Sequence, residues 1–458
     1  MGFLDAVLQM GELDNVSGVE RYVKFPLDVN KEARMIQIYL DIEDLAAHML
    51  HVRGVLRVSL VDFLRASDMK MKYLWRDRVG SNTFWGFTPI YKMGKPPASE
   101  DKRREAFFKD PVIGGKIREC HLKKIKARVL DDYEKEGIFT EGSVARIMED
   151  LPGLMENLMS QLTDNKLSHI VVFGGVGEND RLVYPGEIRA MVEYFEKKLA
   201  ESLGSKEQDE DGCASNLRRC AVCGREGETS NLDKVFKFAT ADKVSILPGL
   251  DESEAPNVFP VCTDCLGKLA TGRSRIEKDF TNTSAIPGMR IWVTPEGVGG
   301  IHSDYRLLVG NLESSMSDGK LGTLGATVEE RYFERLAKHG EGLIFHFVFW
   351  EQNNSQELVH LMVEDVPPER LARLEEGWRQ AFFSVFDQST FTSEVNLDLA
   401  VRSLYRMLSD LAGKSNSDKK VSRDFAVQVL EHLLSGRRPP KETFKQFVVS
   451  RLPAFDSR

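Results

Sequence analysis

Two pairs of cysteines form the clearest chemical pattern in this sequence. Cys220 and Cys223 make one Cys-x-x-Cys pair, and Cys262 and Cys265 make a second. This spacing lets two thiolates point at one ion from a tight turn, and Gly224 can take the positive φ that such a turn often needs. Two such turns brought together make a closed site of four sulfurs, which suits tetrahedral Zn2+. The sequence therefore predicts a structural zinc site without an open position for catalysis.

Other interpretations of the cysteines lead to different chemistry. Two disulfides would need an oxidising compartment, and the N-terminus has no basic segment of the kind that begins a signal peptide. Four free thiols that share this spacing by chance are a further alternative. Cys120 and Cys213 have no partner at Cys-x-x-Cys spacing and are interpreted as ordinary thiols, although Cys213 is close enough to Cys220 to be a rival ligand.

The segments that must position these pairs are predicted from residue patterns. Residues 224–261 exceed the ~15 to 20 residues of a minimal zinc ribbon, so we expect a strand or hairpin between the pairs, and Lys234–Thr240 alternates as a strand does. Residues 205–215 form an acidic linker before the module. After it, Met289–Thr294 has the pattern of a strand, which predicts that the zinc module is inserted into a larger body.

Elsewhere the apolar pattern predicts both strands and helices. Strands are expected at 35–42, at 167–173 and in a hairpin of 342–350 with 358–363; 55–63 fits a strand or a buried helix, and 42–51 is expected to turn helical. Helices are expected in 132–165, in 184–203 and from 367 onward. Gly174–Gly177 resembles a phosphate loop, but Glu178 and Asp180 would repel phosphate, so a plain turn is favoured.

The expected fold class is therefore a mixed α/β (α+β) multidomain protein. An α/β N-terminal body carries an inserted four-cysteine, zinc ribbon-like module and is followed by a C-terminal helical domain. The predicted boundaries are an N-terminal α/β domain at 1–204, the linker at 205–215, the zinc module at 216–280, the continuation of the body at 281–366, and the helical domain at 367–458.

Length and charge restrict the number of domains, the cellular location and the classes of partner that we expect. A chain of 458 residues is too long for one core and suggests two to four domains. No run of about 18 apolar residues is present, so a membrane span is not expected and we predict a cytoplasmic protein. The net charge of -8 argues against a protein that binds nucleic acid over most of its surface, but it is compatible with a local basic groove.

Two stretches of sequence could form such a groove. In the first, which begins at Lys70, cations are interleaved with residues such as Tyr73 and Trp75 before a polar loop. Cations suit phosphates and aromatic rings suit stacked bases. In the second, six cations between residues 116 and 128 accompany one acid, and a helix would place Lys116, Lys123 and Lys124 or Lys126 on one face. A solvated basic face or strand edge remains an equal alternative. The candidate nucleic-acid-binding residues are Arg76, Arg78, Asn82, Thr83, Lys116, Arg118, Lys123, Lys124 and Lys126.

Catalytic patterns are not found in the sequence. Gly413-Lys414-Ser415 lacks the upstream glycine of a Walker loop, and no His-Glu-x-x-His motif occurs. His302 and Asp304 are interpreted as surface or packing residues, and His346, within an apolar strand, as a core histidine with its hydrogen bonds satisfied. The protein is therefore expected not to be an enzyme.

Three segments taken together resemble a known family. Arg219-Cys-Ala-Val-Cys-Gly-Arg, Val235-Phe-Lys-Phe-Ala-Thr-Ala-Asp-Lys and Phe259-Pro-Val-Cys-Thr-Asp-Cys-Leu follow in the order found in the large subunit of subtype I-B CRISPR Cascade complexes, the Csh-type family. Ile286-Pro-Gly-Met-Arg-Ile-Trp-Val is similar to the strand that follows there, and Lys72-Tyr-Leu-Trp-Arg with Thr88-Pro89 resembles its N-terminal segment more weakly. Ala239 stands where the family tends to be aromatic, and the chain is shorter than many members.

The resemblance implies a role in recognition without chemistry. Such a subunit contacts the 5' handle of the guide RNA, reads the protospacer-adjacent motif in double-stranded DNA, helps to separate the strands and recruits a helicase-nuclease. Its implied partners are the guide RNA, the target duplex, the backbone, handle-binding and small subunits of the complex, and the helicase-nuclease. Two alternatives are a zinc-ribbon adaptor that binds only protein and an enzymatic subunit of another CRISPR effector.

Overall fold

The computed structural model describes residues 2–13, 18–27, 32–66, 68–76, 86–113, 116–203, 217–240, 245, 247–297, 302–317, 331–353, 356–387, 395–412 and 415–456. The chain divides into two compact units. Unit 1 comprises Met1–Val16, Leu217–Gly227 and Asn231–Arg458, and unit 2 comprises Ser17–Asn216 with Glu228–Ser230. Among the described residues, no helix is both long enough and apolar enough to cross a membrane.

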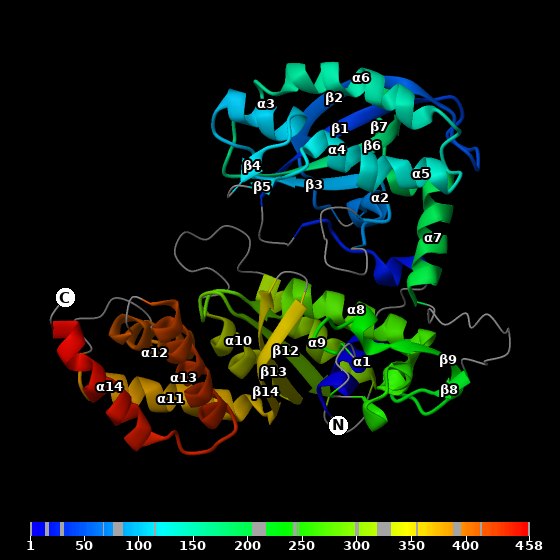
Figure 1. Ribbon diagram of the computed structural model, residues 1–458. Helices are drawn as coiled ribbons and strands as arrows, with labels where there is room; N and C mark the ends of the chain where they lie inside the picture. Colours follow the sequence, from blue (N-terminus) through cyan, green and yellow to red (C-terminus); the bar gives the residue numbers. More distant parts are fainter. Residues whose placement is uncertain are drawn as a thin grey trace. The chain divides into compact units, whose positions relative to one another are not determined.

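Unit 2 is built on a sheet with strand order β2-β1-β6-β3, with β7 paired to β6 (Figure 1). Strand β1 runs parallel to β6 and antiparallel to β2, and β6 runs antiparallel to β3 and β7. The strands are β1 (Ala33–Ile42), β2 (Val52–Asp62), β3 (Ile90–Gly94), β6 (Ser168–Val176) and β7 (Leu182–Val183), and a separate pair is β4 (Val112–Ile113) with β5 (Lys116–Ile117). The helices are α2 (Met69–Tyr73), α3 (Glu100–Phe108), α4 (His121–Ile125), α5 (Asp131–Lys135), α6 (Ser143–Leu158) and α7 (Arg189–Leu203).

The two faces of β1 pack into two different apolar cores, because successive side chains of a strand point to opposite sides. Ile36 and Ile38 belong to the core that includes residues of α6, whereas Met35 and Tyr39 belong to a second core. Helix α6 packs against β2, and its Asp150 accepts the backbone N–H of Val55 at 2.8 Å. The strands expected at 35–42 and 167–173 are therefore confirmed, and 55–63 is resolved in favour of a strand. The segment expected to turn helical, 42–51, forms bends and turns instead.

The glycine pair after Phe173 is neither a phosphate loop nor a turn. Gly174 and Gly175 continue β6. A Cβ atom on Gly174 would lie 2.2 Å from the carbonyl oxygen of Val183, and one on Gly175 would lie 2.3 Å from a methyl carbon of Leu45. Gly174 is thus needed because the backbone of β7 approaches the strand closely, whereas the Leu45 side chain beside Gly175 could move; the sequence pattern reveals neither contact.

Unit 1 is organised around an antiparallel sheet with strand order β11-β12-β13-β14. Trp292 of β12 contacts Phe236, which in turn contacts Phe3 of α1, whereas Phe347 of β13 stacks on Phe333 of α10. Since residues 292 and 347 lie on opposite faces of the sheet, helices cover both sides. The strands are β11 (Thr281–Asn282), β12 (Arg290–Gly297), β13 (Leu343–Asn353) and β14 (Gln356–Val366); the helices that surround them include α1 (Phe3–Glu12), α8 (Thr263–Asp279), α9 (His302–Ser317) and α10 (Tyr332–His339).

Helices α1 and α8 approach each other closely through glycine. A Cβ atom on Gly11 would lie 1.9 Å from the carbonyl oxygen of Lys268, and one on Gly272 would lie 2.0 Å from the carbonyl oxygen of Val7. Both helices also contact β12. The first residues of the chain are therefore part of the core of unit 1, although almost 200 residues of unit 2 follow them in sequence.

The C-terminal part is helical, as expected. It comprises α11 (Pro368–Phe383), α12 (Leu397–Leu411), α13 (Asn416–Leu434) and α14 (Lys441–Asp456). A small apolar core forms where Phe425 stacks on Phe447 at 5.1 Å and packs near Leu408. Asp398 of α12 accepts the backbone N–H groups of Phe333 and Glu334, and this ties the helices to α10.

The overall class, a mixed α/β protein with a four-cysteine cluster and C-terminal helices, agrees with the sequence-based expectation. Residues 217–227 and 231–458 form one unit with the first 16 residues. The sheet at 281–366 is separate from that of unit 2. Periodicity locates strands but does not say which sheet each one joins.

Candidate metal centre

The first cysteine pair lies in a tight turn between β8 (Leu217–Arg219) and β9 (Glu226–Asn231). The backbone N–H of Gly224 donates to the carbonyl oxygen of Cys220 at 2.9 Å, and Gly224 has a φ of 72°. A residue with a Cβ atom would be strained there, so glycine lets the chain reverse and direct both thiols to one side. This part of the prediction agrees with the structure.

The second pair lies where β10 (Pro260–Cys262) passes into α8. Cys262 is the N-cap residue of α8, and Cys265 lies in the first turn of that helix. The free N–H groups of a helix N-terminus favour negative charge, so a thiolate is stabilised there. The two pairs are joined through their backbones, since the N–H of Ala221 donates to the carbonyl oxygen of Pro260 at 2.8 Å.

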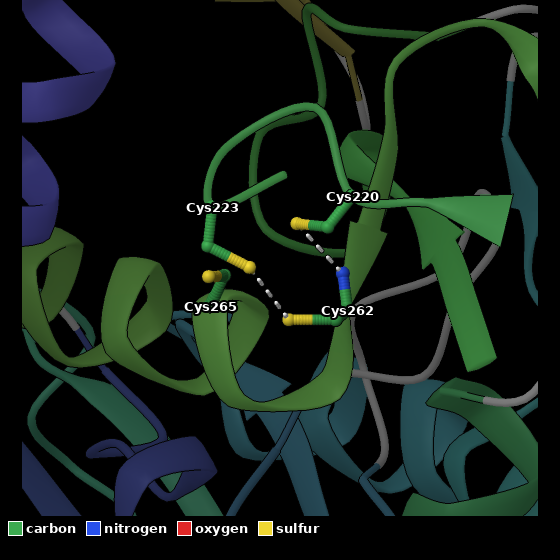
Figure 2. Close-up of side chains that lie close together, drawn as sticks. All are labelled: Cys220, Cys223, Cys262 and Cys265. Carbon is green, nitrogen blue, oxygen red and sulfur yellow. Dashed lines mark hydrogen bonds between the residues drawn. The ribbon is translucent and has the colours of Figure 1, made fainter. Parts of the chain in front are cut away.

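The four sulfur atoms converge on one point (Figure 2). All lie within 4.8 Å of one another, and Cys223 Sγ and Cys262 Sγ are 3.8 Å apart. Tetrahedral zinc with Zn–S bonds of about 2.3 Å would hold its sulfurs about 3.8 Å apart, so the spacing fits this ion. Cys220 and Cys265 are buried, and the other two are half-buried. The cluster is a possible metal site with four ligands, as the sequence predicted.

The electrostatics of the thiols differ between the pairs. A backbone hydrogen bond from Arg225 lowers the pKa of Cys223 to about 6. Burial raises the pKa of Cys265 well above its usual range, and hydrogen bonding from neighbouring thiols adds to this effect. Burial also raises the pKa of Cys262. Burial thus opposes ionisation of Cys262 and Cys265, and a bound metal ion would offset this cost by binding their thiolates.

The segment between the pairs does not form the strand expected at 234–240. It contains the short helix η5 (Leu232–Lys234) followed by turns. Phe236 is fully buried, and the backbone N–H of Lys237 donates to Glu357 of β14 at 2.8 Å. The alternation of apolar and polar residues thus arises from side chains that enter the core of unit 1, and not from pairing in a sheet.

Arg273 of α8 strengthens this junction. Its guanidinium group lies over the ring of Trp292 and binds Glu277 and Glu357. The charges of the two carboxylates raise the pKa of Arg273 despite its burial. A planar cation stacked on an aromatic ring and paired on both sides is a rigid support, so α8 is held against β12 and β14 about two turns beyond Cys265.

The candidate nucleic-acid-binding residues are distributed over separate parts of unit 2. Arg78, Asn82 and Thr83 lie outside the described residues. Arg76 is half-buried and lies over the ring of Tyr22 at 5.1 Å. Thr88, which belongs to the weaker resemblance, donates to the carbonyl oxygen of Leu74 at 3.1 Å. The contact with Tyr22 gives Arg76 a packing role, and its predicted contact with phosphate remains a prediction.

The basic run at 116–128 is not one helix. Lys116 lies in β5, and α4 begins only at His121, so the predicted helical face shared by Lys116 and Lys123 is wrong. Lys123 pairs with Asp110 at 2.6 Å and Lys126 pairs with Asp131 at 2.9 Å, so acids from beyond the run compensate part of its charge. Arg118 is exposed and Lys124 is half-buried.

A second group of metal-ligand type was missed in the sequence. Glu296, His346 and Asp365 come from three different strands, and their side-chain ligand atoms lie within 4.8 Å of one another. The only sequence signal was an isolated histidine in an apolar strand. No local spacing links residues that lie 50 and 19 positions apart, so only the pairing of the strands brings them together.

The region that contains both groups matches a known family. Residues 218–366 match the family model described as the central domain of the CRISPR-associated protein TM1802 (cas_TM1802). The match supports a relationship of this chain to a CRISPR-associated protein family. It covers about a third of the chain, from β8 to the end of β14, and therefore contains both cysteine pairs and all four strands of the sheet β11-β12-β13-β14. No curated protein matches this chain.

Proposed function

We propose that this chain is the non-catalytic large subunit of a type I-B CRISPR Cascade complex. In this role it binds the 5' handle of the guide RNA, reads the protospacer-adjacent motif in the target duplex, aids strand separation and recruits a helicase-nuclease. The observation that carries the proposal is the match of residues 218–366 to a CRISPR-associated central domain, together with the order of the resembling segments. Its place of action would be the cytoplasm.

The metal in the four-cysteine site would be zinc with a structural role. Four thiolates at the separations found here suit a tetrahedral ion, and a fourth protein ligand leaves no position for water or substrate. The ion would fix the turn after β8 against the first turn of α8. Small segments of this kind lack a core of their own and gain their stability from the metal.

Contact with nucleic acid is proposed for part of the basic run in unit 2. Arg118 is exposed and Lys124 is half-buried, whereas Lys123 and Lys126 are paired with acids. A phosphate can displace a surface carboxylate at little cost, since exposed pairs contribute only about 0 to 1 kcal/mol. Each phosphate contact would add to the salt dependence of binding and carry no sequence information.

The decisive experiment measures binding of the assembled complex to target duplexes that differ only in the few flanking base pairs. Complexes with and without this chain are compared, with guide pairing held constant. The proposal predicts that a wrong flank weakens binding about 5- to 150-fold, the usual cost of one lost base contact at about 1 to 3 kcal/mol, and only when this chain is present. Asn82→Ala and Thr83→Ala test whether the predicted loop reads the flank.

Phosphate contact is tested separately with K124A and R118A. Each should reduce the slope of log K against log salt by about 0.9 without altering flank preference, since each phosphate contact releases counterions. Lys135→Ala, at another basic position of unit 2, serves as the control. Binding that ignores the flank with or without this chain would contradict the proposed role and favour a protein-binding zinc adaptor.

A further inference from the structure

The bulged pairing of β13 with β14 brings Asp365 beside His346. Phe345 pairs with Val366 and Phe347 pairs with Val363, so one residue of β13 lies opposite two residues of β14. Asp365 is one of those two and has a φ of 58°. A β-bulge turns side chains away from their regular alternation and is frequent next to functional sites.

Glu296 completes the group from the other side of β13. Thr294 of β12 pairs directly with His346, and Glu296 is two residues further along the same strand face. His346 Nε2 and Glu296 Oε2 are 2.6 Å apart. The side chains of His346 and Glu296 are 0% and 9% exposed, whereas Asp365 is exposed. The group therefore runs from the buried face of the sheet to the surface.

Polar atoms in this group lack partners of the usual kind. His346 Nδ1 and Thr294 Oγ1 are buried and have no hydrogen-bond partner in the described part of the chain. Among the same residues, neither Glu296 nor Asp365 forms an ion pair with a lysine or arginine. Buried polar groups are nearly always satisfied, and a buried carboxylate calls for a compensating charge. A cation would supply the charge that the buried carboxylate of Glu296 calls for.

A metal ion could bind after small side-chain movements, because the direct 2.6 Å contact of His346 Nε2 with Glu296 Oε2 would have to open. The ligand atoms of the three residues lie within 4.8 Å of one another, whereas ligands bonded at about 2.1 Å lie at most about 4.2 Å apart. An exposed Asp365 side chain can close the difference by rotation. One imidazole and two carboxylates are the ligands of divalent transition metals such as Mn2+ and Zn2+, and a set of three leaves positions for water.

We propose that Glu296, His346 and Asp365 form a second metal site that binds a divalent transition-metal ion. It is independent of the four-cysteine site in its ligands and differs in kind, because it is open to water where the other is closed. Its nitrogen and oxygen donors also accept Mn2+, which thiolates bind poorly. The inference rests on the sheet of unit 1 and does not depend on the proposed role in CRISPR recognition.

The test uses the full chain with its four-cysteine site loaded with zinc. Mn2+ is titrated in, and free Mn2+ is measured by electron paramagnetic resonance while metal analysis follows the zinc content. One saturable equivalent of Mn2+ with unchanged zinc is expected. D365N should weaken Mn2+ binding at least about 10-fold and H346Q should abolish it. Because Asp365 is exposed, D365N should leave the fold intact.

Glu364→Gln is the matched control. Glu364 is the other residue of the bulge and accepts the backbone N–H of Phe3 at 2.8 Å, which a glutamine can also do. E364Q should bind Mn2+ as the unmodified chain does. A linear rise of free Mn2+ from the first addition would overturn the proposal. Equal affinity of D365N and the unmodified chain would overturn it as well, since the ion would then be bound elsewhere.

Discussion

The four-cysteine cluster and the Glu296–His346–Asp365 group lie in the same unit but are assembled in opposite ways. The cysteines come in two local pairs, each placed by a turn or a helix end, and only two segments must meet. The second group takes one residue from each of three strands and exists only once the sheet has its register. The cysteine cluster needs only two local segments to meet, whereas the second group depends on a sheet that is already formed.

Removal of the metal from the four-cysteine site should have the largest effect. Small zinc domains gain about 10 kcal/mol or more from the ion, so C262S or a strong chelator should locally unfold residues 217–231 and 258–265, ahead of the part of α8 that packs on α1. Limited proteolysis followed by mass spectrometry would detect new cleavage there. C120A is the control, because Cys120 has no Cys-x-x-Cys partner. Full zinc content and unchanged cleavage in C262S would show that the cluster is not a metal site.

Breaking the second group should cost less and leave the fold intact. H346L removes the partner of Glu296 and leaves a buried carboxylate, for which a loss of about 3 kcal/mol in the free energy of unfolding is expected. The double variant E296M/H346L replaces both groups with apolar side chains and should recover much of that loss. Urea unfolding with saturating zinc would measure both. A double variant less stable than H346L would argue against an uncompensated charge.

Asp398 is a second buried carboxylate that can be compared with Glu296. It accepts backbone N–H groups, whereas Glu296 contacts a histidine. Burial raises the pKa of Asp398 to about 7. Between its unfolded pKa near 4 and this value the folded state binds more protons, so this residue makes stability fall as the pH rises. D398N should remove a slope of up to about 1.4 kcal/mol per pH unit from unfolding measured between pH 5.5 and 7. Parallel pH profiles of the two proteins would contradict the assignment.

The smallest effect is expected at the exposed end of the second group. Without added metal, D365N and D365G should change the free energy of unfolding by less than about 1 kcal/mol, since asparagine and glycine both accept a positive φ. D365A, which does not favour this conformation, should lose more. Thermal unfolding of the three variants would check the order. A large loss in D365G would mean that the carboxylate itself supports the sheet.

The two groups also show which features of a site can be predicted from the sequence. The four-cysteine cluster was predictable to the residue, because Cys-x-x-Cys spacing by itself brings each pair of thiols together. Several elements were also predictable, including β1 and the hairpin of β13 with β14, because their apolar patterns are typical of strands. His346 was correctly placed in a strand, but its partners depend on strand register and on a bulge, and neither is encoded in a local pattern.

Other expectations failed for related reasons. The alternation at 234–240 is the same whether a segment pairs in a sheet or inserts side chains such as Phe236 into a core. The run of cations at 116–128 looked uncompensated because Asp110 and Asp131 lie outside it. Long-range pairing decides both cases, and periodicity or charge counting within a window does not report it.

The close contact of α1 with α8 bears on how the chain is made. Residues 3–12 leave the ribosome about 250 residues before the helix and the strand they pack against. At about 5 to 20 residues per second, that interval lasts roughly 15 to 50 seconds. During it the apolar face of α1 has no native partner in unit 1, while the residues of unit 2 are being synthesised. The nascent chain thus carries an exposed amphipathic helix through most of its synthesis, a natural target for a chaperone.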